Sequence, residues 1–469
     1  MLLVAWLGVC AVLAWTTRRR PLVALVAVLV VWVAVPVAAT ELLTGRATGP
    51  LGAHPASWLT LVTVAAQLAY APRRILRVTA DHVFLVLALG LVAAVATFTT
   101  QQSGTGGIAL LLDMVVAPLV LFVLLLTVVD GDAPRLDAVR NALLALGAAS
   151  SLLAVVQWVT GSVLVYEAQH STQWWFDPEK FDRWMATFDH PLTLSMFLCV
   201  TSPLIVGLRR ASLQLGLVAL FAAAVTITQS RSGVVVVGVV AVWVVLRSRA
   251  PSHVRLLSLC LLAGGAAALL ASGLAEGVGA RFADDTGSTG ARTDALRFFG
   301  ETWTDYLLIG HGLTSSYGIA AQSGLVASLE NSFLMYAVDI GTVFAVVYFG
   351  AQAALVVRSW TRPVQLPGAR QAALIAFVLP LTYSGLAARS ATATILWVAL
   401  GLAVARRGAA RPLPAAGDRS GGWDGDGAVV PGHDRAVVVR GSARAGRAGQ
   451  GAVPVPLSRR TVTADPSSS

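Results

Sequence analysis

Long runs of apolar residues dominate this chain of 469 residues and limit what it can fold into. Runs of about 20 such residues can cross the hydrocarbon core of a bilayer as helices, because a helix satisfies its own backbone hydrogen bonds there. Hydrophobic residues make up 56% of the chain and charged residues only 12%, whereas a soluble domain has about a quarter charged. We therefore predict an all-α polytopic membrane protein.

The apolar runs predict about 12–13 transmembrane helices. They cover residues 2–15, 21–39, 57–71, 82–98, 108–129, 139–160, 190–208, 212–228, 232–247, 254–274, 331–357, 370–387 and 390–405. The first run is not expected to be a signal peptide, because its basic cluster, Arg18–Arg20, follows the apolar residues instead of preceding them. Residues 1–407 are thus predicted to form one transmembrane bundle.

Arginines alternate between the loops in the way that the positive-inside rule requires. If Arg18–Arg20 lie in the cytoplasm, the other cytoplasmic loops carry Arg73, Arg74, Arg77, Arg135, Arg140, Arg209, Arg210, Arg247, Arg249, Arg255, Arg358, Arg362, Arg370, Arg406 and Arg407. The two long loops, 161–189 and 275–330, then lie outside the cell. Lys180 is the only lysine beside many arginines, and together with the Ala, Val and Gly bias this suggests a high-GC bacterial genome. We expect a bacterial cytoplasmic membrane protein with its chemistry on the outer face.

The larger outer loop contains an amphipathic pattern. Leu296, Phe299, Trp303 and Leu307 recur at three- and four-residue spacing, opposite Arg297, Glu301 and Asp305. This spacing predicts a helix that lies at the membrane interface.

The segment after Arg407 has no apolar periodicity and is rich in Gly, Arg, Pro and Ser. Such a composition buries too little apolar surface to fold, so 408–469 is predicted to be a disordered cytoplasmic tail. Much of the net charge of +10 lies after Ala405 and the rest in short loops, where basic residues set topology, and we do not expect a nucleic-acid partner. The three cysteines lie inside apolar runs, so no disulfide, metal site or cofactor is indicated.

Arg231 stands in a short polar segment, TQSRSG, between two apolar runs on the outer side. A guanidinium at this depth suits a phosphate or pyrophosphate whose lipid tail stays in the bilayer. The alternative is a topological arginine that extends to the interface.

Two further arginines precede or belong to the interfacial helix. Arg292 is expected at its start, where the helix N-terminus would help to hold an anion. Arg297 has Glu301 one turn later, which fits a helix ion pair as well as a direct role.

Glu330 and Asn331 begin the return into the membrane. Partial burial would move the pKa of Glu330 toward that of a general base, whereas its alternative role is a carboxylate favoured at a helix start. His311, in the glycine-rich turn 310–312, is a further candidate.

The smaller outer loop places Trp175 and Trp184 near Asp189 and His190. Aromatic rings beside carboxylates fit a sugar-binding surface, and tryptophans also line membrane interfaces. Arg389, between the last two runs, could join the cationic residues.

Four segments in this order resemble the O-antigen ligase / Wzy-type polymerase superfamily of bacterial envelope glycosyltransferases. They are ATFDHPLTLSMFL, TQSRSG, ARTDALRFFGETWTDYLLIGHGL and LENSFLMYAVDIGTVFAVVYFG, within residues 185–350. The resemblance implies a helical bundle with an outer loop over a lipid-facing cleft. It also implies glycan transfer from a polyprenyl-pyrophosphate donor to an acceptor glycan without metal or nucleotide.

In this resemblance the paired arginines of the family correspond to Arg231 and Arg292, and Glu330 stands where ligases commonly have a histidine. That departure favours a polymerase over a ligase that acts on lipid A core. We accordingly expect Arg231, Arg292 and Glu330 to be catalytic. Arg297, Arg389, Asn331, His190, Asp189 and His311 are the expected substrate-binding residues.

Two alternatives stay open. One is a transporter or flippase of lipid-linked sugar, for which Asp113 and Asp339, acids in or near apolar runs, are the relevant residues. The other is a non-catalytic scaffold that works with other envelope polysaccharide assembly proteins.

Overall fold

A computed structural model describes residues 1–46, 49–173, 175–177, 182–270, 285–325 and 328–406. These residues are helical with no strand, which confirms the predicted all-α class for the part of the chain described. They belong to one compact unit, Met1–Arg411. The predicted tail from residue 408 onward and parts of both long loops lie outside the described residues.

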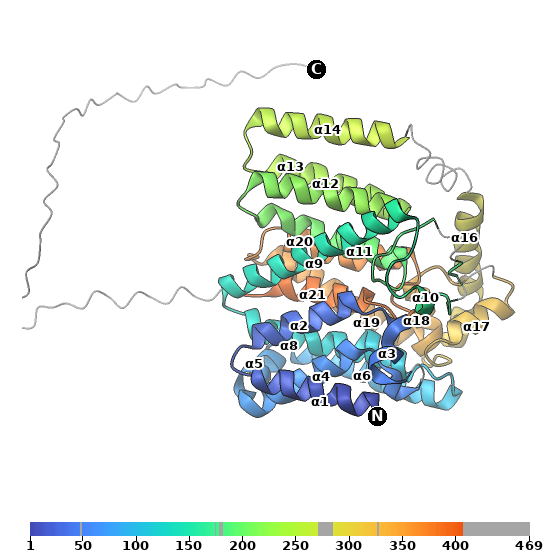
Figure 1. Ribbon diagram of the computed structural model, residues 1–469. Coiled ribbons are helices and arrows are strands. Elements are labelled where there is room, and N and C mark those ends of the chain that lie inside the picture. Colours follow the sequence, from blue (N-terminus) through green and yellow to red (C-terminus); the bar gives the residue numbers. More distant parts are fainter. Residues whose placement is uncertain (47–48, 174, 178–181, 271–284, 326–327, 407–469) are drawn as a thin grey trace, which may run out of the picture. The chain divides into compact units, whose positions relative to one another are not determined.

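The helices follow one another with short connections (Figure 1). They are α1 (Leu2–Thr16), α2 (Pro21–Ala34), α3 (Thr40–Thr44), α4 (Pro55–Tyr70), α5 (Pro72–Asp81), α6 (Val83–Ser103), α7 (Ile108–Leu111), α8 (Ala117–Val129), α9 (Ala133–Thr160), α10 (Glu167–His170), α11 (Pro191–Thr201), α12 (Ala211–Ile227), α13 (Arg231–Arg247), α14 (Ser252–Leu270), α16 (Asp285–Thr302), α17 (Ser315–Gln322), α18 (Ser332–Ile340), α19 (Thr342–Thr361), α20 (Ala369–Val378) and α21 (Thr392–Val404). Single turns of 3-10 or π helix connect or extend several of them.

Four helical segments of the described chain are long and apolar enough to cross a membrane. They are Val83–Ser103, Ile108–Val129, Ala133–Thr160 and Thr342–Thr361, and a fifth, Pro21–Ala34 with Val37–Thr44, bends by 94° at its break. Others are shorter apolar helices of 10–17 residues, such as Thr392–Val404. The described residues therefore contain the apolar helices expected of a multi-pass membrane protein. Fewer of these helices are long enough to span a bilayer than the 12–13 that we predicted.

Breaks inside the apolar runs account for part of the difference. The predicted run 190–208 changes to 3-10 geometry at Ser202, just before Pro203, and 370–387 does so at Leu379, just before Pro380. Proline removes a backbone donor and ends regular α geometry nearby. Gly341, with φ of 102°, separates α18 from α19 within the run 331–357.

The core gathers around α21, whose residues from Thr392 to Ala403 are all buried. A helix that is apolar on every side suits such a position. It packs on α8, α19 and α20. By contrast α6 leaves Phe84, Leu87 and Leu91 exposed, as expected of a helix whose outer side meets lipid.

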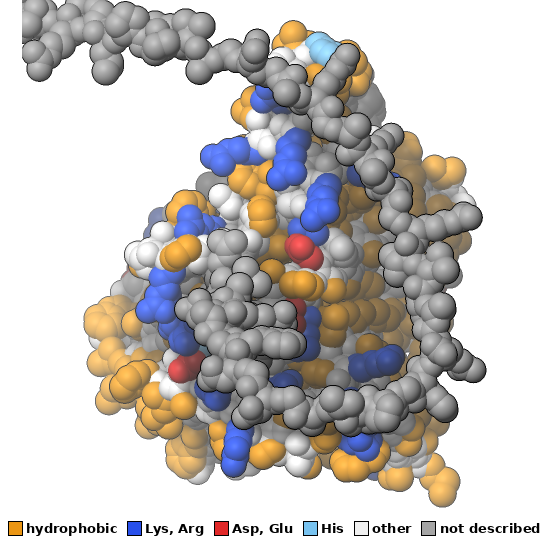
Figure 2. Space-filling view, turned by 90° about the vertical axis from the view of Figure 1, so that its left-hand side faces the viewer, with side chains coloured by type: hydrophobic (Ala, Val, Ile, Leu, Met, Phe, Trp, Pro, Cys, Tyr) orange, Lys and Arg blue, Asp and Glu red, His pale blue; other side chains and the backbone are white. Residues whose placement is uncertain are grey.

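The helix ends separate by charge. The connections that carry the arginines assigned above to the cytoplasmic side lie at the left-hand end of the bundle in Figure 1. Figure 2 shows that Arg side chains gather on this face with few acids. We call it the basic face. The other end carries α3, α10, α16 and α17, and there α16 runs across the direction of α12, α13 and α14 (Figure 1).

The structure corrects the predicted interfacial helix. It begins at Asp285 and ends at Thr302, and Trp303–Tyr306 forms a 3-10 turn. Leu307 lies beyond both. Arg292 is therefore inside α16 and not at its start, so the helix N-terminus cannot help it to hold an anion.

Candidate functional site

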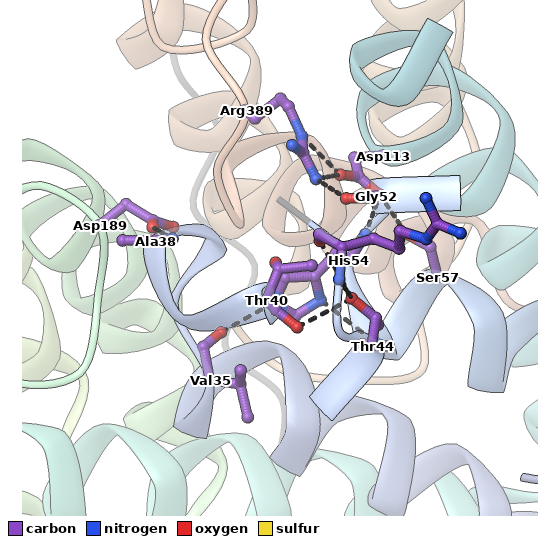
Figure 3. Close-up of polar contacts among 12 residues, drawn as sticks. Val35, Ala38, Thr40, Thr44, Gly52, His54, Ser57, Asp113, Asp189 and Arg389 are labelled. Atoms are coloured by element: carbon purple, nitrogen blue, oxygen red, sulfur yellow. Dashed lines mark hydrogen bonds and ion pairs between the residues drawn. The ribbon is translucent and has the colours of Figure 1, made fainter. Parts of the chain in front are cut away.

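A buried ion pair lies at the centre of a polar cluster inside the bundle (Figure 3). The carboxylate of Asp113 is fully buried, and its Oδ2 lies 2.7 Å from a terminal nitrogen of Arg389, whose side chain is 20% exposed. The Nε of Arg389 donates to the same oxygen at 2.9 Å, and Nη2 also donates to the carbonyl of Gly52 at 2.6 Å. A buried charge needs such pairing, since otherwise it costs several kcal/mol.

The second carboxylate oxygen of Asp113 is held by the start of α4. It accepts hydrogen bonds from the backbone N–H of His54 at 2.8 Å and from the hydroxyl of Ser57 at 2.7 Å. Asp113 itself lies in the π turn Leu112–Val116, which interrupts the helical segment Ile108–Val129. Such π turns occur frequently at functional sites.

His54 joins this carboxylate to α2. Its ring stacks on Trp32 with centroids 4.1 Å apart, and its Nε2 lies 2.8 Å from the carbonyl oxygen of Val35. Its Nδ1 accepts from the N–H of Ala56, which caps α4. Burial lowers the pKa of His54 to about 4, so the imidazole is neutral at pH 7.

Asp189 lies next to Ala38 and apart from the ion pair in Figure 3, although the charges of Arg389 and Asp113 still act on it. Its Oδ1 accepts from the N–H of Ala38 at 3.1 Å. Burial raises the pKa of Asp189 to about 7, while the positive charge of Arg389 opposes that shift. The residue keeps some accessible surface, so its proton can exchange with water. We refer to Gly52, His54, Ser57, Asp113 and Arg389 as the Asp113 cluster.

His190 caps α11. Its Nδ1 accepts from the N–H of Leu192 at 3.1 Å, and its ring meets Trp175 edge to face at 4.9 Å. Its Nδ1 is therefore used by the helix.

Asn331 caps α18. Its Oδ1 accepts from the N–H groups of Phe333 and Leu334, and its Nδ2 donates to the carbonyl of Leu381 at 2.8 Å. Both ends of the amide are thus used by the protein, which gives this predicted binding residue a structural role.

Glu330 precedes this cap and is partly exposed, with a positive φ of 50°. Its charge acts on the hydroxyl of Tyr317 in α17. Burial raises the pKa of Tyr317, and a hydrogen bond to the side chain of Ser384 opposes that shift. The charges of Asp339 and Glu330 raise this pKa further. A non-glycine residue with positive φ is uncommon and marks a site worth testing.

The loop 383–391 connects α18, which follows Glu330, with the Asp113 cluster. Ser332 donates to the carbonyl of Tyr383 and accepts from the N–H of Leu386, and the Tyr336 hydroxyl donates to the carbonyl of Leu386. The same loop carries Arg389. Its position is therefore fixed from two sides.

The TQSRSG segment packs against the smaller long loop. Gln229, at φ of 53°, donates from Nε2 to the backbone and side chain of Asp182, and Arg183 donates to the carbonyl of Thr228. Ser230 caps α13 by accepting from the N–H of Gly233. Arg231 is the first residue of α13 and is partly buried.

The remaining candidates lie on the surface of the larger long loop, 275–330. Arg292 is exposed on α16. Arg297 pairs with Asp294 at 3.8 Å, with both side chains mostly exposed, and not with Glu301 as the spacing suggested. His311 is exposed, and its ring meets Tyr306 edge to face.

The structure thus brings some predicted residues together and leaves others apart. Arg389 belongs to the Asp113 cluster, and the charge of Arg389 acts on Asp189. No hydrogen bond or ion pair among the described residues links Arg231, Arg292 and Glu330 to one another. Sequence reasoning missed His54 and Ser57, and it did not pair Asp113 with Arg389; an acid within an apolar run was the one available signal.

Fold and site define the class as an all-helical, multi-pass membrane protein with a buried ion pair. No grouping of His, Cys, Asp or Glu within the described part could hold a metal ion. Comparisons with protein-family models, curated proteins and solved structures found no match for this chain.

Proposed function

We propose that this protein transfers or polymerises oligosaccharide from a polyprenyl-pyrophosphate carrier onto an acceptor glycan, at the outer face of a bacterial cytoplasmic membrane. The observation that carries the proposal is the position of Arg231. It starts α13, a helix of 17 residues, whose chain direction places it at the end opposite the basic face (Figure 1). A guanidinium at a helix N-terminus is suited to a diphosphate.

The proposal includes the topology. The basic face lies in the cytoplasm by the positive-inside rule, so the end with α10, α16 and α17 faces outward. The shorter apolar helices then also cross the membrane, some of them as broken spans, and the two long loops are extracytoplasmic.

The chemistry is an inverting displacement. An acceptor hydroxyl attacks the anomeric carbon, the glycosyl–phosphate bond breaks, and the electron pair leaves with the polyprenyl diphosphate. Arg231 stabilises the negative charge that develops on this leaving group. Glu330 accepts the proton of the hydroxyl.

The test compares Arg231→Ala with Arg46→Ala, a matched arginine that is exposed in another connection. With purified protein in liposomes and a lipid-linked repeat unit, Arg231→Ala should lower the transfer rate by about 10²–10³, the cost of removing one preorganised charge donor. Arg231→Lys should recover little, because a point charge lacks the guanidinium's planar fork. Wild-type rates in Arg231→Ala would reject the proposal.

Transport of a lipid-linked sugar is the second candidate, and the Asp113–Arg389 pair favours it, because buried ionisable residues in membrane bundles often line transport pathways. The same liposomes distinguish the two functions. Movement of the lipid-linked sugar between leaflets without lengthening of its glycan would indicate transport.

A further inference from the structure

The basic face contains a pocket that the proposed chemistry does not use. Its volume is about 500 Å³, and it lies between the end of α13, the 3-10 turn Ser202–Gly207 and the connection from α19 to α20. Three arginines line it: Arg247, Arg249 and Arg370. None of the lining residues is acidic, so the pocket concentrates positive charge.

The walls of the pocket are fixed by backbone contacts. Gly368, at φ of 85°, packs directly against the carbonyl of Pro203, where any Cβ atom would clash. Arg370 donates from Nε to the carbonyl of Ser359 at 2.8 Å and from Nη2 to that of Arg362. The pocket is therefore built by the fold and is not merely a gap between mobile side chains.

Two features of the pocket favour an anion. α20 begins at Ala369, and its N-cap Gly368 and first-turn residue Gln371 line the pocket, so the partial positive charge of the helix N-terminus lies at its wall. Arg247 and Arg249 are both exposed, and guanidinium groups bind phosphate oxygens through two parallel hydrogen bonds.

The surroundings favour a lipid over a soluble phosphate. On α13, Val235, Val239, Val242 and Leu246 are exposed and recur at four- and three-residue spacing, which makes one apolar stripe that ends beside Arg247. Trp243 lines the pocket, and its ring lies 5.9 Å from the Arg247 guanidinium. Tryptophan at a helix end is typical of the membrane–water interface.

We propose that this pocket binds the phosphate headgroup of an anionic phospholipid, whose acyl chains lie along the apolar stripe of α13. Arg247 and Arg249 contact the phosphate. Arg370 holds the wall of the pocket through its bonds to the α19–α20 connection. Basic pockets between helices on the cytoplasmic side bind anionic headgroups in this way.

The experiment titrates phosphatidylglycerol or phosphatidylcholine into the full-length protein in detergent and follows its thermal unfolding. The test variant is Arg247→Gln with Arg249→Gln. The matched control is Arg73→Gln with Arg74→Gln, two exposed arginines of α5 on the same face. Arg370 is left unchanged because it bonds to the backbone.

Phosphatidylglycerol should stabilise the wild type more than phosphatidylcholine does. The test variant should bind phosphatidylglycerol about twenty-fivefold more weakly, since each arginine contributes about fivefold, and the control should stay close to wild type. If the test variant fails to fold, Arg249→Gln alone should show about a fivefold loss.

Three results would overturn the proposal. Equal losses in test and control variants would show only a diffuse surface attraction. Unchanged affinity in the test variant would exclude the pocket. Stabilisation by inorganic phosphate or glycerol phosphate as strong as that by phosphatidylglycerol would assign the site to a soluble anion.

Discussion

At the scale of single residues, the Asp113 cluster shows how this bundle keeps charge in its interior. Each carboxylate oxygen of Asp113 has a donor, and Arg389 divides its guanidinium between that carboxylate and the carbonyl of Gly52. The pair joins residues 276 positions apart. Removal of this ion pair should therefore disturb both the segment that contains Gly52 and His54 and the loop 383–391.

Replacing Arg389 tests this role. Arg389→Ala should lower the free energy of unfolding by about 3–5 kcal/mol, because it leaves Asp113 buried and unpaired. Adding Asp113→Asn should restore much of the loss, since no uncompensated charge then remains. Denaturant titration in detergent measures both variants. A loss below about 1 kcal/mol in the single variant would show an ion pair no stronger than an exposed one.

Asp189 predicts a pH dependence of stability. It lies between α10 and α11, outside the membrane-crossing helices. Burial raises its pKa from 3.8 to about 7, so folding favours its protonated form. The stabilisation is complete below about pH 4 and is lost as the pH rises through about 7.

Asp189→Asn keeps an oxygen acceptor for the N–H of Ala38 but does not titrate. Its melting temperature relative to wild type should therefore rise between about pH 5 and about pH 8. Parallel pH curves for the two proteins would show that Asp189 does not carry this dependence.

At the scale of elements, glycines allow α18 to pack against the turn that follows α16. A Cβ atom on Gly310 would clash with the backbone carbonyl of Asp339, and one on Gly341 would lie 2.7 Å from the carbonyl oxygen of Leu308. The backbone N–H groups of His311 and Gly312 donate to the carbonyls of Val338 and Asp339. The glycine-rich turn thus has a packing role.

Gly310→Ala tests this packing. Overpacking at such a contact should cost about 1–3 kcal/mol in the free energy of unfolding. Gly318→Ala is the matched control: it lies in α17 with nothing within 4 Å of an added Cβ, and it should stabilise by about 0.5–1 kcal/mol. Similar effects of the two substitutions on thermal unfolding would contradict this contact.

The apolar runs predicted where the apolar helices lie. They could do so because the length of an uninterrupted apolar run is a local property of the sequence. Breaks at Asp113 and Ser202 were not predicted, since a π or 3-10 turn depends on what the neighbouring helices offer. The extended start of α16 was missed for the opposite reason: residues 285–291 have little apolar pattern. The sequence could not predict that Arg389 pairs with Asp113, because the two residues are 276 positions apart.

At the scale of the whole molecule, the distribution of arginine divides the described bundle into two ends. The basic face gathers the arginines of the connections on one side (Figure 2), and its pocket is proposed to bind lipid headgroups. The end opposite it carries Arg231 and Glu330. The proposed transfer of glycan requires that this second end face outward.

Labelling of single cysteines in intact cells tests that requirement most directly. In a background where the exposed Cys260 is replaced by alanine, Ser323→Cys places a thiol just after α17, and Arg73→Cys places one on the basic face; both positions are exposed. A membrane-impermeant maleimide should label Ser323→Cys in intact cells and Arg73→Cys only after permeabilisation. The reverse pattern would contradict the proposed function.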